Sequence, residues 1–304
     1  MSDEIAQAAR WLQAGRVVAF PTETVYGLGA DAHNPLAVRQ VFALKGRPTD
    51  HPLIVHIHSA QQMSLWAQPT AVAQALAARF WPGPLTLILP RTAHTPDEVT
   101  GGQSTVGLRV PAHPTAQQLL AAFGGGLAAP SANRFGRISP TTAQHVRDEF
   151  GDSVAVLDGG ACAVGVESTI VDLSGAQPAL LRPGGLPLEE IEAITGPLQG
   201  TSTVRAPGTL ASHYAPHTAL VVTAHIDAEV QRLQGQGLRV AVLRAAADDV
   251  YARQLYAELR RLDQQGVDVL IAEPAQGYGG LAMAINDRLA RASTPPAIDP
   301  KNPA

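Results

Sequence analysis

Two successive series of strand and helix patterns, separated by a stretch rich in Gly, Ser, Thr and Pro, constrain the fold of this chain more than any other feature. In the first series, short β-branched or apolar runs alternate with helical patterns, which is typical of an α/β or α+β sheet domain. The second series runs strand, helix, strand, helix, strand, helix, and predicts a small parallel sheet. We therefore predict a sheet domain over 1–197, a linker over 198–216 and a smaller parallel-sheet domain over 217–304.

The individual elements are predicted from apolar periodicity and from turn residues. The first series has predicted strands at 16–20, 53–57, 85–89, 105–110, 154–157 and 169–173, with strand-like runs at 127–129 and 180–182. Its predicted helices are 3–14, 35–44, 70–80, 114–123 and 141–150, the last with Thr141 or Ser139 as N-cap. The second series has predicted strands at 219–223, 239–243 and 267–272 and helices at 227–234, 250–264 and 281–292.

The composition excludes several classes of protein. Of 304 residues, 45% are hydrophobic and 16% are charged, which fits a globular chain and not a disordered one. The net charge of −4 and the lack of a run of Lys or Arg predict no tight autonomous binding of RNA. Cys162 is the only cysteine, so we expect no intramolecular disulfide and no cysteine-built metal centre. With an acidic start unlike a signal peptide and no membrane-spanning run, this predicts a cytoplasmic protein.

Lysine is rare in this chain, which makes one lysine conspicuous. Of 22 basic residues only Lys45 and Lys301 are lysines, and Arg47 follows Lys45 on a loop shaped by Gly46 and Pro48. An ammonium and a guanidinium so close together can hold different oxygens of a polyphosphate. A solvated basic turn at a helix end explains the pattern equally well.

Polar residues also follow several predicted strands, where α/β proteins bind ligands. Thr22 and its polar neighbours Glu23 and Thr24 can bond a small polar substrate or simply form a turn. Ser131 and Asn133 follow the strand-like run at 127–129 and suit an anion. Ser139 fits the same anion site, although an N-cap is the simpler account of it.

Further candidates lie at or near strand ends. Ser168 precedes one strand and Arg182 ends another; a surface ion pair also explains Arg182, and Ser168 lacks the Gly-x-Ser-x-Gly elbow of a hydrolase nucleophile. His56 and His58 alternate on a strand, but no recognised ligand spacing predicts a metal, and His56 instead suits a carboxylate substrate. Cys162 has no obvious His partner and is interpreted as structural.

A combination of motifs follows in a fixed order over residues 21–184: Pro-Thr-Glu-Thr-Val-Tyr-Gly-Leu-Gly, Lys-Gly-Arg-Pro, Pro-Leu-Ile-Val-His, Trp-Pro-Gly-Pro-Leu-Thr, Arg-Val-Pro-Ala-His-Pro, Ala-Pro-Ser-Ala-Asn, Gly-Val-Glu-Ser-Thr and Leu-Arg-Pro-Gly. In this combination and order, the segments resemble the threonylcarbamoyl-AMP synthase family, whose catalytic part is a YrdC-like domain. The linker and the βαβ tail resemble the longer, two-domain branch of that family. The resemblance implies a twisted, open mixed sheet in the catalytic domain and a Rossmann-like C-terminal domain.

The activity that this resemblance implies is that of an L-threonylcarbamoyladenylate synthase, a nucleotidyltransferase. Such an enzyme condenses L-threonine, bicarbonate and ATP, releases pyrophosphate, and supplies the N6-threonylcarbamoyladenosine modification of tRNA through separate transfer proteins. No protein nucleophile is required, since the enzyme excludes water and neutralises developing charge. Magnesium is expected on the ATP phosphates, held mostly through water.

The resemblance also assigns roles to individual residues. Lys45 and Arg47 would be catalytic. Tyr214 matches a family tyrosine that folds over the nucleotide, so the linker is expected to act as a lid. Residues 208–212 depart from the family pattern because a basic side chain is missing. The threonine group would be Thr22, His56, Arg109 and Ser168, and the ATP group Lys45, Arg47, Thr105, Ser131, Asn133, Ser139, Arg182 and Tyr214.

Two other functions are alternatives, but they fit this sequence less well. YrdC-like domains also occur in hydrogenase-maturation carbamoyltransferases, which form carbamoyl-adenylate, but those chains carry zinc-finger-like parts for which this sequence lacks the cysteines. A non-catalytic RNA-binding module is the second alternative, and the net charge of −4 in residues 1–197 argues against it.

Overall fold

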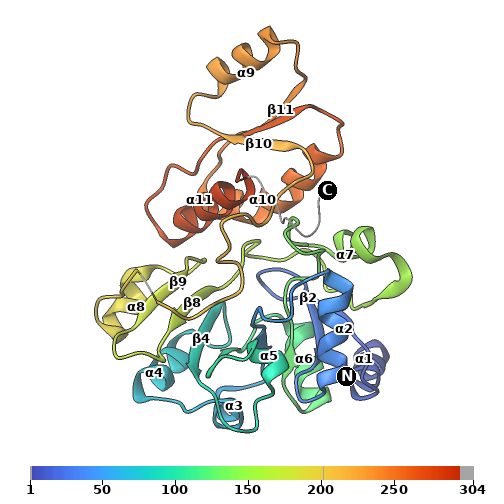
Figure 1. Ribbon diagram of the computed structural model, residues 1–304, viewed down its shortest axis with the longest axis vertical. Coiled ribbons are helices and arrows are strands. Elements are labelled where there is room, and N and C mark those ends of the chain that lie inside the picture. The colour runs from blue at the N-terminus through green and yellow to red at the C-terminus, as the bar shows by residue number, and fades with distance from the viewer. Residues whose placement is uncertain (1, 201, 295–304) are drawn as a thin grey trace.

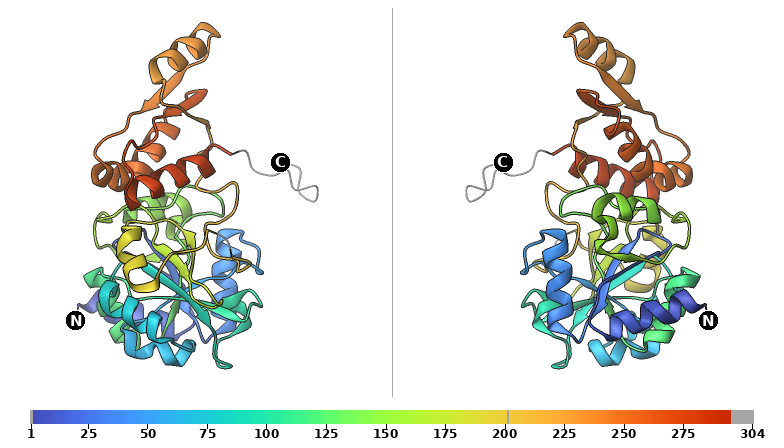
Figure 2. Two further views of the ribbon diagram at one scale, coloured as in Figure 1. Left: turned by 90° about the vertical axis from the view of Figure 1, so that its left-hand side faces the viewer. Right: turned by 90° about the vertical axis from the view of Figure 1, so that its right-hand side faces the viewer.

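The computed structural model describes residues 2–200 and 202–294 as two parts, each built on its own sheet. Figure 1 shows the part with the nine-stranded sheet at the bottom and the part with the three-stranded sheet at the top. The side views in Figure 2 show the same stacking, with C-terminal helices lying directly above the first part. These are α10 (Asp248–Asp263) and α11 (Gly280–Ala292), whose apolar residues share a core with Val25, Ile138 and Val166 of the first part.

The large sheet contains every strand predicted in the first series, with slightly different bounds. The strand-like runs at 127–129 and 180–182 are also confirmed as strands. The strands are β1 (Val18–Phe20), β2 (Gly27–Asp31), β3 (Ile54–His56), β4 (Leu85–Pro90), β5 (Thr105–Arg109), β6 (Leu127–Ala128), β7 (Ala155–Val156), β8 (Thr169–Asp172) and β9 (Ala179–Arg182).

The strand order β7-β1-β2-β6-β3-β5-β4-β8-β9 mixes parallel and antiparallel neighbours. The pairs β1–β7, β3–β5 and β4–β8 are parallel, whereas β1–β2, β2–β6, β3–β6, β4–β5 and β8–β9 are antiparallel. This mixed sheet, together with the smaller parallel sheet, confirms the predicted fold class.

The strand β2 was not predicted, because its two glycines are typical of a turn. Both glycines are required by packing: a Cβ on Gly29 would lie 2.7 Å from the Phe20 ring, and one on Gly27 would lie 3.3 Å from both Phe20 and Ala129. The Phe20 ring therefore packs closely against the backbone of the neighbouring strand, which excludes a side chain at Gly29 and leaves little room for one at Gly27.

Five predicted helices of the first part are confirmed: α1 (Asp3–Gln13), α2 (Pro35–Lys45), α4 (Ala71–Phe80), α6 (Pro114–Phe123) and α7 (Ala143–Phe150). The predicted N-cap of α7 is wrong, because Thr142 accepts the cap hydrogen bond from the His145 amide while Ser139 and Thr141 lie upstream. The helix α8 (Leu188–Thr195) was missed because Ile191 is its only buried residue, which leaves a weak periodic signal. Also unpredicted are the short α3 (Met63–Trp66) and α5 (Asp97–Thr100) and 3₁₀ turns at Ala60–Gln62 and Gly151–Ser153.

The two faces of the central strands have different neighbours. Alternate residues such as Val55, Leu87 and Leu108 enter the main hydrophobic core, which also includes side chains of α3 and α4. The opposite face presents Ile54 and Ile88, and Val204 and Ala206 of the linker pack against them. The candidate site lies on this second face.

The C-terminal part contains β10 (Ala219–Val222), β11 (Val240–Leu243) and β12 (Val269–Ala272), all parallel in the order β10-β12-β11. The helix α9 (Ile226–Gly235) covers one face of this sheet and packs against Ile271 of β12. Leu270 and Ala272 of the same strand point to the other face, toward α10 and α11. The predicted strands and helices of this part are therefore confirmed. Because α10 and α11 are on the side of the first part, the C-terminal sheet itself stays away from the site (Figure 1).

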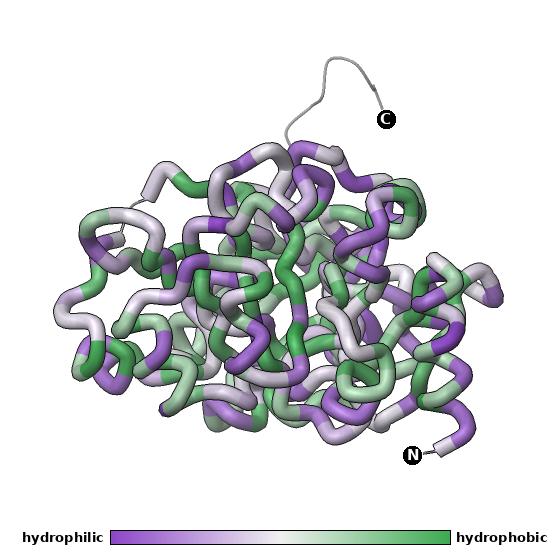
Figure 3. Tube along the Cα trace, turned by 90° about the horizontal axis from the view of Figure 1, so that it is seen from below, coloured by the Kyte–Doolittle hydropathy of each residue, from purple (hydrophilic) through white to green (hydrophobic). Residues whose placement is uncertain are grey.

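Hydrophobic residues follow this layering. Seen from below in Figure 3, the green stretches run through the middle of the molecule and the purple ones lie mostly at its rim. Across residues 2–200 and 202–294, no helix has the length and apolar character needed to cross a bilayer.

Candidate active site

A small cavity lies between the second face of the large sheet and the linker. About 50 Å³ of space is left in it. Its floor contains Ile54 and His56 of β3 and Arg109 of β5, which are neighbours because these strands are parallel and His56 pairs with Arg109. Its other walls include Thr22, Thr24, Val25, Arg47, Ser131, Glu167, Ser168, Arg182, Pro207, Gly208, His213 and Tyr214.

Lys45 is the last residue of α2 and is only 3% exposed, so the solvated basic turn considered from the sequence is wrong. Its Nζ donates to the carbonyl oxygens of Ser131 and Asn133, both at 2.6 Å. Gly46 ends the helix with φ 64°, which turns the chain toward Arg47. Burial, reinforced by the nearby Arg47 charge, holds the pKa of Lys45 well below its usual range.

Arg47 lines the cavity and is also buried. Its Nη2 donates to the Pro52 carbonyl oxygen at 2.9 Å, and its guanidinium lies 5.7 Å from the centre of the Phe135 ring. Burial lowers the pKa of Arg47 to about 10. An anion in the cavity would favour the charged form of both basic residues.

Arg109 already has a carboxylate partner. Its Nη2 lies 2.7 Å from Glu23 Oε1, and its Nη1 donates to Thr24 Oγ1 at 2.8 Å. The other Glu23 oxygen accepts a hydrogen bond from the Ala112 amide at 2.9 Å. This buried ion pair fixes the guanidinium at the floor of the cavity.

Thr22 and His56 complete the polar floor. Thr22 Oγ1 donates to the Val25 carbonyl oxygen at 2.6 Å and accepts from the amides of Thr24 and Val25, so the hydroxyl also shapes its own turn. Burial and the Arg109 charge lower the pKa of His56 to about 3, which keeps its ring neutral. His58 lies beyond the end of β3 and does not line the cavity.

Ser168 and Arg182 form one hydrogen-bonded unit on the opposite wall. Arg182 Nε donates to the Ser168 carbonyl oxygen, and Nη2 donates to Ser168 Oγ, both at 3.0 Å. Its Nη1 donates to the Pro207 carbonyl oxygen of the linker at 3.0 Å. Arg182 is 3% exposed, so the surface ion pair considered from the sequence is wrong.

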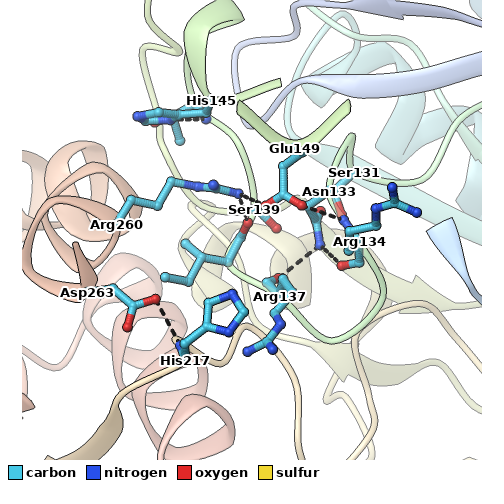
Figure 4. Close-up of polar contacts among 12 residues, drawn as sticks. Ser131, Asn133, Arg134, Arg137, Ser139, His145, Glu149, His217, Arg260 and Asp263 are labelled. Atoms are coloured by element: carbon cyan, nitrogen blue, oxygen red, sulfur yellow. Dashed lines mark hydrogen bonds and ion pairs between the residues drawn. The ribbon is translucent and has the colours of Figure 1, made fainter. Parts of the chain in front are cut away.

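Four predicted ATP residues lie outside the cavity wall or beside it. Lys45 contacts the loop that carries Ser131 and Asn133 through its two hydrogen bonds. Asn133 Nδ2 donates to the carbonyl oxygens of Arg134 and Arg137 (Figure 4). Ser139 Oγ donates to Glu167 Oε1 at 2.5 Å, so it contacts the wall through a carboxylate. Thr105 lies at the start of β5, on the same face as Arg109 but distant from it along the strand.

The linker closes the cavity with His213 and Tyr214, which are both buried. Tyr214 adopts φ 62°, an uncommon conformation for a non-glycine residue, and its ring lies 5.8 Å from the ring of Tyr256 in α10. Gly208 has φ 78° and lies directly against the Tyr214 hydroxyl and Arg182, where a side chain would collide. The conformation of the linker is therefore specified by close contacts at both ends.

Glu167, like His213 of the linker, is a site residue that sequence reasoning did not single out. It lines the cavity, and the charges of Arg288 and Arg182 outweigh its desolvation and lower its pKa to about 2. Its partners Ser139, Tyr256 and Arg288 come from three distant segments, so only its place next to Ser168 could have pointed to it.

Taken together, fold and site define a two-domain α/β protein with a cavity that is lined by buried arginines and closed by its interdomain linker. A family model described as "Telomere recombination" matches residues 10–184, and one described as "Threonylcarbamoyl-AMP synthase, C-terminal domain" matches residues 186–294. The chain belongs to the threonylcarbamoyl-AMP synthase family.

Individual relatives agree with this assignment. Threonylcarbamoyl-AMP synthases of Pyrococcus abyssi and Bacillus subtilis are each 42% identical to this chain, over 95% of it, and over 94% and 93% of their own lengths. A solved structure described as P. abyssi Sua5 complexed with L-threonine superimposes with a TM-score of 0.90 at 41% identity, covering 96% of this chain and 95% of that chain.

Proposed function

We propose that this protein condenses L-threonine, bicarbonate and ATP to threonylcarbamoyl-AMP, releases pyrophosphate, and thereby supplies the threonylcarbamoyl group for modification of tRNA. Threonine and ATP are the substrates to which the family relationship points most directly. Bicarbonate is the carbon source that the product requires, because the carbamoyl carbon comes from neither threonine nor ATP.

The observation that carries this proposal is a surplus of buried positive charge. Among residues 2–200 and 202–294, Lys45, Arg47 and Arg182 form no ion pair with a carboxylate, although all three are buried. Burying an uncompensated charge is costly, so such a cluster is expected where an anionic ligand completes it. The triphosphate of ATP has the charge and the length to contact all three.

Threonine would bind at the floor of the cavity. Its carboxylate suits Arg109, whose guanidinium is fixed by Glu23 and Thr24, and its polar groups suit the hydroxyls of Thr22 and Ser168. The neutral ring of His56 adds no charge there, so it leaves the threonine amine free to react with bicarbonate.

The chemical step needs orientation and charge neutralisation. The threonine amine combines with bicarbonate and releases water to give a carbamate. A carbamate oxygen then attacks the α-phosphorus of ATP, the bond from that phosphorus to the oxygen bridging to the β-phosphorus breaks, and pyrophosphate leaves with the bonding electrons. Lys45 and Arg47 would stabilise the charge that develops on the phosphates, and the linker would exclude water. Carbamates decompose in water, so a closed cavity protects the intermediate.

The linker has to move before ATP can enter. The present space of about 50 Å³ is far below the roughly 300 Å³ of a small ligand pocket. Hydrogen bonds of Arg205 to Gln103 and Gly101, and of Ser202 to Asp172, hold the linker on the first part and would break on opening. Tyr214 would then return over the bound nucleotide.

Magnesium would arrive with ATP. Within the described ranges, no group of three or more His, Cys, Asp or Glu side chains is arranged to hold a metal ion. The phosphate oxygens and water would therefore supply most of the ligands of Mg²⁺.

The product would pass to a separate transferase that acts on tRNA in the cytoplasm. We expect no tight binding of tRNA by this chain alone, since its net charge is −4.

The test is release of pyrophosphate by purified protein with ATP, magnesium, bicarbonate and L-threonine, leaving out each small substrate in turn. Release should require both and should collapse in Lys45→Ala, whereas Arg39→Ala, an exposed arginine on the same helix, should retain it. Threonine-independent release would indicate a carbamoyl-adenylate enzyme, and no release despite ATP binding would indicate a binding module.

A further inference from the structure

The C-terminal part reaches Glu167 in the wall of the active site through two side chains, and one of them is a buried arginine. Arg288 of α11 is 1% exposed, and its Nε donates to Glu167 Oε2 at 2.9 Å. Its Nη2 donates to the Pro183 carbonyl oxygen at 3.0 Å, and its guanidinium lies 5.3 Å from the centre of the Tyr214 ring. A single side chain of the second part therefore contacts the catalytic part and the linker together.

Glu167 receives a second contact from the same direction. The hydroxyl of Tyr256 in α10 donates to Glu167 Oε2 at 2.8 Å, while Ser139 Oγ donates to Oε1. The carboxylate thus has partners at both oxygens, and two of its three hydrogen-bond donors belong to the C-terminal part. Its negative charge is directed toward Arg288.

Glu167 is also next to a cation that the reaction needs. Its neighbour in sequence, Ser168, holds Arg182 through its carbonyl oxygen and its hydroxyl. Glu167 and Arg182 line the same cavity and influence each other's charge, but they form no ion pair in the described part of the chain. After Arg288, Arg182 is the cation that acts on the Glu167 carboxylate, so a carboxylate without Arg288 would be left with Arg182 in this wall.

We propose that Arg288 is a positioning residue of the nucleotide site: it holds the Glu167 carboxylate away from Arg182 and so keeps Arg182 free to bind a phosphate of ATP. This inference rests on the proposed function for its choice of ligand. It gives the C-terminal part a role in the chemistry of a site whose cavity is lined by the first part and the linker.

General energetics favour this role over a purely structural one. A buried ion pair is often no more stabilising than an apolar pair of the same volume, so stability alone does not call for an arginine and a glutamate here. An apolar residue at position 288 alone could not compensate the Glu167 charge, which lies in the wall of the proposed polyanion site.

The test measures ATP binding by calorimetry, without threonine, so that it does not depend on turnover. Arg288→Gln should raise the dissociation constant for ATP about tenfold, since the released Glu167 would pair with Arg182. The dissociation constant of Arg288→Lys for ATP should lie between those of wild type and Arg288→Gln. The double variant Glu167→Gln with Arg288→Gln should bind ATP more tightly than Arg288→Gln alone, because the competing carboxylate is gone.

Controls separate this effect from loss of folding. Arg261→Gln removes an exposed arginine of α10 and should leave ATP binding unchanged. If Arg288→Gln does not fold, Tyr256→Phe decides, because it removes only the hydroxyl that contacts Glu167 and should weaken ATP binding by about threefold.

The outcomes are distinct. A folded Arg288→Gln that binds ATP within about twofold of wild type, or a double variant no better than the single one, overturns the inference. If Arg288→Gln does not fold, unchanged ATP binding by Tyr256→Phe overturns it instead. If wild type releases no threonine-dependent pyrophosphate yet the binding series follows the expected order, the proposed reaction fails while the role of Arg288 stands.

Discussion

Arg109 lines the cavity and is paired with Glu23, whereas the other buried lysines and arginines of the described residues fall into two groups that are arranged in opposite ways. Arg47 and Arg182 line the cavity, Lys45 lies just outside its wall, and all three are held by carbonyl or hydroxyl oxygens. Arg288, at the junction of the two parts, is paired with the carboxylates of Glu167 and Asp287. The first group keeps its charge available to a ligand, and the second neutralises charge within the protein.

This difference distinguishes basic residues that are retained for ligand binding from those whose removal mainly lowers the stability of the fold. A buried cation held only by neutral oxygens costs folding free energy and is retained for what it binds, whereas a compensated one is damaging to remove because its partner is left alone. The following predictions break or sharpen this comparison, beginning with the largest expected effect.

Replacing Lys45 by Met should abolish most of the activity and change the stability of the fold only slightly. Pyrophosphate release should fall about a thousandfold, or about 4 kcal/mol, because a cation is lost from the phosphate site. The urea midpoint should change little, since burial already disfavours the ammonium. Steady-state kinetics and urea unfolding check this, with Arg39→Met on the same helix as the control. A strongly destabilised but active variant would contradict the comparison.

Replacing Arg288 by Met should have its main effect on stability. The free energy of unfolding should fall by about 3 kcal/mol, because Glu167 keeps a buried charge without its main partner. Urea unfolding measures this, and Arg261→Met, which breaks only an exposed pair with Glu258, should lie within about 0.5 kcal/mol of wild type. Equal stability of both variants would mean that Arg288 belongs with the cavity group.

Acid should destabilise the protein through its buried histidines. Burial lowers the pKa of His56 and of His213 to about 3, below the value of 6.5 for a free histidine. The unfolded state therefore binds protons first, and stability that is complete above pH 6.5 is lost as pH falls toward 3. At pH 5 each histidine should cost roughly 2 kcal/mol.

Urea unfolding at pH 7 and pH 5 measures this loss. The variant His213→Gln should be less acid-sensitive than wild type by that amount, and substitution of the exposed His225 should not change the sensitivity. Equal sensitivity of the His213→Gln variant and wild type would show that His213 is not buried as a neutral ring.

The smallest expected effect concerns the linker. Gly208→Ala should lower stability by about 1 kcal/mol and raise the KM for ATP, because φ is 78° there and a Cβ would collide with the Tyr214 hydroxyl. Gly200→Ala, with open space around it and no positive φ, is the matched control. Thermal unfolding and ATP titration of both variants check this, and indistinguishable variants would argue against a closed linker.

Much of the fold could be predicted from the sequence, because most elements carry a strong local pattern. The helices α6 and α10 have periodic apolar residues, and the strands β4 and β8 are short apolar runs. The exceptions have physical causes. The glycines of β2 leave room for the Phe20 ring, and α8 buries a single side chain. Neither element therefore has an apolar periodicity from which it could be predicted.

The candidate site was predicted less evenly. Lys45 attracted attention as a rare lysine, but the sequence could not distinguish a solvated turn from a buried ammonium, because burial is decided by the loop carrying Ser131 and Asn133. Glu167 was passed over because its partners Tyr256 and Arg288 lie 89 and 121 residues away along the chain.

The sequence by itself determined the order of the elements, the two-part organisation of the sheets and the family, since local periodicity and short motifs contain that information. Only the tertiary structure decided which charges are compensated. Burial and ion pairing depend on side chains brought together from distant segments: Glu23 with Arg109, and Glu167 with Arg288. The same long-range packing left Arg47 and Arg182 in the wall of one cavity and Lys45 just outside it, none of them paired with a carboxylate in the described part of the chain.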